Sequence, residues 1–327
     1  MLGQIFTIAR NTFTESIRQP IFLVVLLACC FLLVLNPFFA TYTLDDDNKL
    51  LIDLGMSTIL LGGLFLAAFT ATGVLAREIE NKTVLTVISK PIGRPAFVLG
   101  KFFGVAGALG VACYIWSLIF LLTLRHRVMF TAAHELDQPV LTFGIGAAVI
   151  ALIVAVWGNY FYGWVFSSRF AGILAGTLSA AYLLVLLIDK EWQFQGITTE
   201  FTAAGGSLMQ VLIALALVLQ SLIMICSIAI ACSTRLGQVM TLMVCLGIFL
   251  LGLSSDWMIG RFTDAYPLVW IAYAAVPNLG FGWLADALTQ GHPITGGYFG
   301  IVTGYYAIYT AAILCLASAL FQTREAG

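Results

Sequence analysis

The chain has 327 residues, of which 61% are hydrophobic and only 9% are charged, and its formal net charge is −1. A soluble domain usually carries about 25% charged and about 45–50% apolar residues, so this composition excludes an ordinary globular enzyme and a disordered chain. A nearly neutral chain also exerts no overall attraction on nucleic acid, and we expect no nucleic-acid partner. The class that remains is a polytopic membrane protein.

The first 20 residues are too polar to span a membrane. Their apolar side chains recur at helical spacing, while polar side chains cover the other face of the same helix. The pattern predicts an amphipathic helix over residues 1–20 that lies in the membrane interface, and Pro20 marks the start of the first span. The apolar positions are Leu2, Ile5, Phe6, Ala9, Phe13 and Ile17.

Residues 21–327 read as a single transmembrane domain. A helical span takes about 20 apolar residues, and the sequence contains eight apolar runs near that length. We therefore predict an all-α membrane protein with about eight transmembrane helices; the alternative is six spans plus a re-entrant or surface hairpin. The runs are Ile21–Phe39, Leu54–Ala76, Phe102–Leu124, Leu141–Phe166, Phe170–Ile188, Leu208–Ala231, Val239–Leu253 and Tyr298–Phe321.

The basic residues indicate how the chain is oriented. With the N-terminus in the cytoplasm, ten of the 15 Lys and Arg residues fall inside and five fall outside, as the positive-inside rule requires. An even number of spans then leaves both termini cytoplasmic. Arg125 and Arg127 are the exceptions on the outside.

The longest predicted extracytoplasmic segment covers residues 254–297. It contains the apolar stretch Val269–Ala275, which is too short to span, and aromatic side chains that suit the headgroup level, such as Trp270 and Trp283. The pattern predicts short interfacial or re-entrant helices here.

The spans contain almost no ionisable side chain, whereas proton-coupled carriers need such groups at depth. Asn159 and Gln220 are the polar side chains that we weigh as lining a pathway. The alternative is that both form hydrogen bonds with neighbouring helices.

The segment 77–101 carries the strongest signal in the sequence. A charged stretch, Arg77–Lys82, directly follows the second predicted span, and a short amphipathic stretch, Thr83–Ser89, follows it. Pro91 and Pro95 then bracket a rigid turn. Such a segment would present apolar and charged side chains to a cytosolic partner; the alternative is an ordinary basic inside loop.

This segment resembles the hallmark of type-2 ABC exporter permeases. In that family a span ends in a Glu-rich turn, a short coupling helix and a "Ser-Lys-Pro…Arg" turn follow, and a Gly-Lys pair opens the next span. The matching positions here are Glu78, Glu80, Thr83, Ser89, Lys90, Pro91, Arg94, Gly100 and Lys101.

Two further stretches agree with this resemblance. Residues Ala9–Pro20 look like the family's N-terminal elbow helix. Val276–Phe281, with Asp286–Leu288 and Gly291, looks like the element before the last span. The combination is typical of the subgroup named for multicopper-enzyme maturation.

The resemblance implies a permease subunit of an ATP-driven exporter in the cytoplasmic membrane of a prokaryote. A second permease subunit, identical or not, would pair with it among the membrane lipids, and a separate ABC ATPase would bind ATP and magnesium. This chain would then hold no catalytic residue, cofactor or metal. The ATPase-coupling residues would be Arg77, Glu78, Glu80, Lys82, Thr83, Lys90, Pro91 and Arg94.

Two other functions remain open at this point. An ATP-independent carrier or channel would work without nucleotide. A membrane scaffold, or an enzyme acting on lipid, is the third possibility; the enzyme would need a catalytic cluster at a membrane face, and the sequence shows none.

Overall fold

The computed structural model describes residues 2–40, 47–80, 93–126, 137–196, 208–262 and 266–322. These residues form helices joined by short turns, with no β-strand among them beyond a single bridge between Ile188 and Phe194. The helices are α1 Leu2–Arg18, α2 Pro20–Ala40, α3 Asp47–Glu80, α5 Arg94–His126, α6 Gln138–Tyr162, α7 Phe166–Leu187, α9 Leu208–Ser233, α10 Gln238–Met258, α11 Pro267–Ala275, α12 Ala285–Thr289 and α13 Gly296–Gln322, with 3-10 turns η1 Gly260–Phe262 and η2 Gly280–Gly282.

Within the described part of the chain, eight helices are long and apolar enough to cross a membrane. They are α2, α3, α5, α6, α7, α9, α10 and α13, which confirms the predicted all-α polytopic class and gives the predicted number of candidate spans. Two of them exceed the length of a span, because α3 has 34 residues and α5 has 33. At 1.5 Å per residue each measures about 50 Å, against about 30 Å of hydrocarbon.

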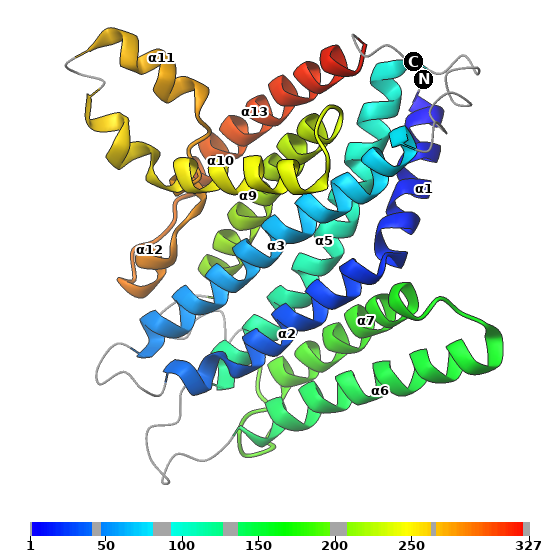
Figure 1. The fold of residues 1–327 in the computed structure, drawn as a ribbon. Helices are drawn as coiled ribbons and strands as arrows, with labels where there is room; N and C mark the ends of the chain where they lie inside the picture. Colours follow the sequence, from blue (N-terminus) through cyan, green and yellow to red (C-terminus); the bar gives the residue numbers. More distant parts are fainter. Residues whose placement is uncertain are drawn as a thin grey trace.

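Helix α13 ends on the side of the bundle where α1 and α5 begin (Figure 1). The ring of Phe321 near the end of α13 stacks on Phe97 of α5 with centroids 5.5 Å apart, and α3 ends on the same side. We call this side of the bundle the terminal side. The opposite side holds the end of α2 and the start of α3.

The core of the bundle is built around α3, α5 and α9. Trp116 of α5 is fully buried there, and its indole N–H donates to the carbonyl of Leu26 in α2 at 3.1 Å. Close contacts between α2 and α3 replace side chains by glycine: a β-carbon added at Gly62 would lie 2.3 Å from the sulfur of Cys29. Small residues at such positions let membrane helices approach closely.

The α6–α7 hairpin flanks this core (Figure 1). Alanines of α6, among them Ala151 and Ala155, are buried, and the Thr177 hydroxyl of α7 donates to the carbonyl of Ala147 at 3.0 Å. The outward side of α6 exposes apolar side chains such as Ile153, as expected of a helix that faces lipid.

A largely buried arginine near the end of α5 binds this hairpin on the opposite side of the bundle. Arg125 donates to the carbonyls of Val185 and Ile188 at 3.1 Å each. Its Nε lies 3.6 Å from Asp137, which is fully buried before α6, and its Nη2 lies 3.9 Å from Asp189. One of the two basic exceptions to the predicted orientation is thus held in place by protein groups and need not be solvated as a free loop cation.

Candidate functional site at the junction of α1, α3 and α5

The predicted coupling segment connects the two longest helices directly. Arg77, Glu78 and Glu80 belong to the end of α3, of which the structure describes the backbone, and the half-buried Arg94 is the first residue of α5. Lys82, Thr83, Lys90 and Pro91 lie outside the described residues. Any displacement of this segment therefore acts on helices that continue without a break into the core.

Helix α1 packs along the first half of α5, and glycines of α5 make the contact possible. A β-carbon added at Gly100 would lie 2.7 Å from Ile8, and one added at Gly104 would lie 2.4 Å from Thr12. The contacts ascend together along both helices, so α1 runs in the same direction as α5. The interfacial position of residues 1–20 stays a prediction. The structure adds that α1 lies alongside the first half of α5 and runs parallel to it.

The sequence pattern identified only part of the side of α1 that faces the protein. Thr12 and Ser16 are buried, although both are polar, while Leu2 and Phe6 are 83% and 71% exposed. Only the start of the apolar stripe is thus left for another surface, because Phe13 and Ile17 from its second half pack against the core. Small polar side chains lie beside them where α1 packs most tightly. The signal that could have revealed this is the spacing of Gly100 and Gly104.

Helix α1 and the residue that follows it also contact both helices that flank the coupling segment. Glu15 lies 3.8 Å from the ammonium group of Lys101 in α5, and that group lies 5.6 Å from the centroid of the Phe97 ring. On α3, a β-carbon added at Gly73 would lie 2.7 Å from the amide oxygen of Gln19. The three helices therefore meet in one junction on the terminal side.

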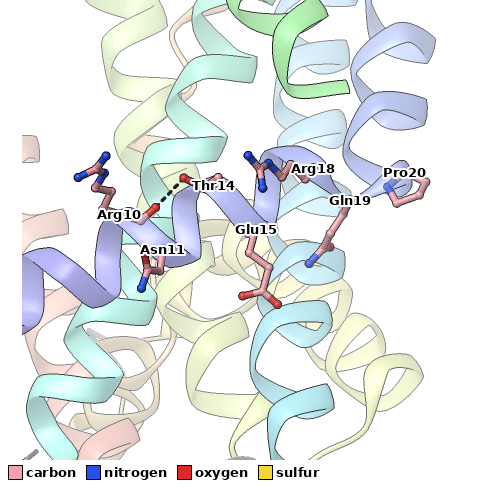
Figure 2. A pocket seen from close by; sticks show the side chains of 7 residues that line it. All are labelled: Arg10, Asn11, Thr14, Glu15, Arg18, Gln19 and Pro20. Atoms are coloured by element: carbon pink, nitrogen blue, oxygen red, sulfur yellow. Dashed lines mark hydrogen bonds between the residues drawn. The ribbon is translucent and has the colours of Figure 1, made fainter. Parts of the chain in front are cut away.

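A shallow, open hollow of about 650 Å³ lies on the outer side of this junction. In Figure 2 the side chains of Arg10 and Arg18 project from one side of α1, and those of Asn11, Glu15 and Gln19 from the other. Thr14 lies between the two arginines, and its hydroxyl donates to the carbonyl of Arg10 at 2.9 Å. The hollow thus presents two guanidinium groups, one carboxylate and neutral polar groups. The lining residues are Arg10, Asn11, Thr14, Glu15, Arg18, Gln19 and Pro20.

Neither of the two predicted pathway residues lies in this junction. The amide of Asn159 donates to the carbonyl of Trp164 at 2.6 Å, across the turn that joins α6 to α7. Gln220 of α9 accepts a hydrogen bond of 3.1 Å from the hydroxyl of Thr303 in α13. Their role in a pathway stays a prediction.

Metal ligation finds no support among the described residues, where no group of three or more His, Cys, Asp or Glu side chains is placed to hold an ion.

Comparison with protein families supports a transporter. Residues 6–158 match the family described as ABC-2 family transporter protein, and this range runs from α1 into α6, so it contains the whole junction. A search of curated proteins found no similar sequence. The match covers a little less than half of the chain and supports a membrane permease subunit of an ABC transporter.

Proposed function

We propose that this chain is the permease subunit of an ATP-driven ABC exporter, and that a separate ATPase subunit docks on the terminal side against the segment 77–101. The observation that carries the proposal is that the matched family range and the helix junction fall on the same part of the chain. The range that matches ABC-2 family transporter proteins ends in α6, and within it α1, α3 and α5 converge on that segment.

The mechanical basis is the continuity of the junction with the core. Helices α3 and α5 extend about 20 Å beyond the length of a span, so each can act as a lever whose long arm lies in the membrane. Contacts of α1 with Gly100, Gly104 and Lys101 brace one lever, and Gln19 against Gly73 braces the other. ATPase closure would therefore move the three helices as one rigid body between two states of access.

The proposed partners follow from this arrangement. The ATPase supplies ATP and magnesium, and a second permease subunit completes the pathway. Surrounding lipids cover apolar side chains such as Ile153 and Leu183, which are 59% and 58% exposed. In this proposal the membrane is the cytoplasmic membrane of a prokaryote, with both termini in the cytoplasm.

Co-purification of the ATPase tests the proposal. Glu78→Lys and Glu80→Lys are made singly and together, and the ATPase retained on the tagged permease is quantified at matched expression. A partly desolvated charge-assisted contact contributes about 1.5–3 kcal/mol, so the double reversal should weaken docking by tens-fold or more. Glu191→Lys is the control, because Glu191 is exposed just beyond α7 on the opposite side.

The proposal predicts loss of ATPase and of transport-linked hydrolysis in the double variant, with monodisperse protein and full retention in Glu191→Lys. Equal retention and equal hydrolysis in all variants would show that these carboxylates belong to an ordinary solvated loop. Transport that persists without nucleotide would favour the ATP-independent carrier instead.

A further inference from the structure

The chain between α10 and α13 reaches the opposite side of the bundle before α13 begins. Asp286 of α12 lies there, 3.2 Å from Lys49 of α3. The Ile294 N–H donates to the side chain of Gln210 of α9 at 2.7 Å. Gln210 is the third residue of α9. Helix α13 therefore starts at the same end of the bundle as α9.

The 276–283 loop, residues Val276–Trp283, lies much deeper. The Asn278 N–H donates to the hydroxyl of Tyr305 at 2.8 Å, and Tyr305 is the tenth residue of the 27 in α13. A β-carbon added at Gly282 would lie 2.2 Å from the hydroxyl of Ser221, the 14th residue of the 26 in α9. These contacts place the loop about a third of the way along α13 and about halfway along α9.

The 276–283 loop also positions a carboxylate of α10. Oδ1 of Asp256 accepts hydrogen bonds from the Tyr273 hydroxyl at 2.5 Å and from the Asn278 amide at 2.8 Å. The Asn278 amide oxygen in turn accepts from the Gly280 N–H at 2.8 Å, which fixes the orientation of the amide. Among the described residues no hydrogen bond ends on Oδ2 of Asp256.

This arrangement limits what the exposed side of Asp256 can face. The side chain is exposed in the isolated chain, and a carboxylate facing acyl chains at this depth is costly. Non-helical backbone at membrane depth is tolerated only where it is buried in protein or lines an aqueous cavity. Asp256 therefore needs a polar or charged neighbour beyond this chain, such as water, another subunit or a bound cation.

Aromatic rings cluster next to the carboxylate. Phe281 meets Tyr305 edge to face with centroids 5.4 Å apart, and Tyr309 lies 5.0 Å from Tyr305. The Tyr309 hydroxyl donates to the carbonyl of Ala274 and so ties α11 to α13. A carboxylate beside aromatic rings is the combination that recognises organic cations, through charge and through cation–π attraction.

We propose that Asp256, with Tyr273, Tyr305 and Tyr309, forms a binding site well inside the bundle for organic cations of amphiphilic character. This site names the substrate class of the permease, and its role in transport rests on the proposed function. Asn278 is a positioning residue, because it holds Asp256 and the loop backbone without needing to touch the ligand.

Binding to the purified chain in detergent tests the site without any ATPase. The probe is tetraphenylphosphonium, and tetraphenylborate is the control ligand, since it has the same shape and the opposite charge. In Asp256→Asn the amide oxygen still accepts from Tyr273 and Asn278, so the variant loses the charge and keeps the fold. Glu191→Gln removes an exposed carboxylate elsewhere and serves as the protein control.

We expect tetraphenylphosphonium to bind the wild-type chain much more tightly than tetraphenylborate, and Asp256→Asn to weaken it about tenfold or more, since a charge-assisted contact is lost. Affinity within about twofold of wild type in a monodisperse Asp256→Asn chain would overturn the site. Equal binding of both probes by the wild-type chain would also overturn the site. This comparison tests the proposal even if the variant fails to fold. ATPase co-purification is independent of these results, so either proposal can fail alone.

Discussion

The carboxylate of Glu15 in α1 lies 3.8 Å from the ammonium group of Lys101 in α5. Lys101 is almost fully buried and follows Gly100, which admits Ile8 of α1, whereas the Glu15 side chain is 46% exposed. The pair joins the N-terminal helix to the helix that leaves the predicted coupling segment. It therefore links two stretches that resemble the same permease family separately in the sequence.

Removing Glu15 should destabilise the chain more than removing both partners. Glu15→Ala leaves the buried ammonium group of Lys101 without this carboxylate, and we expect a loss of about 1–2 kcal/mol, discounted for the exposure of Glu15. Lys101→Met in the Glu15→Ala background should restore most of it. Thermal unfolding in detergent measures the cycle, and additive losses would show that the two charges do not interact.

Gly104 should tolerate no side chain. In Gly104→Ala the new β-carbon would lie 2.7 Å from the backbone oxygen of Ala9, so α1 must shift, at a cost of about 1–3 kcal/mol. Gly110→Ala on the same helix is the matched control, since nothing lies within 4 Å of its added β-carbon. Equal melting temperatures for the two variants would contradict the close packing of α1 on α5.

Arg125 should be needed for a stable α6–α7 hairpin. Arg125→Met leaves the fully buried Asp137 without its cation, and breaking a buried pair in this way costs about 3–5 kcal/mol. Adding Asp137→Asn should recover part of this loss, because the buried charge is then gone. Lys190→Met, at an exposed position of the same region, should be neutral; a comparable drop in its melting temperature would argue against a specific role for Arg125.

The orientation of the chain is testable by cysteine labelling. Cys315 is the exposed one among the seven native cysteines, so Cys315→Ser provides the background. Asp46→Cys should react with an impermeant maleimide in intact cells, and Lys82→Cys and Arg324→Cys only after permeabilisation, because the basic excess lies on their side. Labelling of position 82 in intact cells would reverse the proposed topology.

The segment Asp256–Gly297 should resist proteolysis from outside. Leu279, Ala285 and Leu288 are buried, and the loop that carries Leu279 lies halfway along α9. A protease specific for aromatic residues, added to spheroplasts, should therefore spare Phe281 and Trp283. Phe194, which is 90% exposed beyond α7, is the internal control and should be cut; cleavage at Phe281 as fast as at Phe194 would mean that the segment is an exposed loop.

The sequence by itself determined the class and the number of spans. Hydrophobic runs such as Phe102–Leu124 identify membrane helices because each span must satisfy its own backbone hydrogen bonds in hydrocarbon, whatever its neighbours are. The charged stretch Arg77–Lys82 and the turn at Pro91 likewise mark the coupling segment locally. Neither inference needs the position of another helix.

Only the tertiary structure decided which side chains meet. Thr12 and Ser16 are polar, yet both are buried, Thr12 against Gly104 of α5, because helix approach in a membrane depends on size more than on polarity. Asp256 read as an extracytoplasmic residue, yet the contacts of Asn278 with Asp256 and with Tyr305 place it well inside the bundle, about a third of the way along α13. The depth of a re-entrant loop is set by the helices that receive it, here through Gly282 against Ser221 and Gly252 against Pro277, and such pairings between distant segments leave no periodic pattern in the chain.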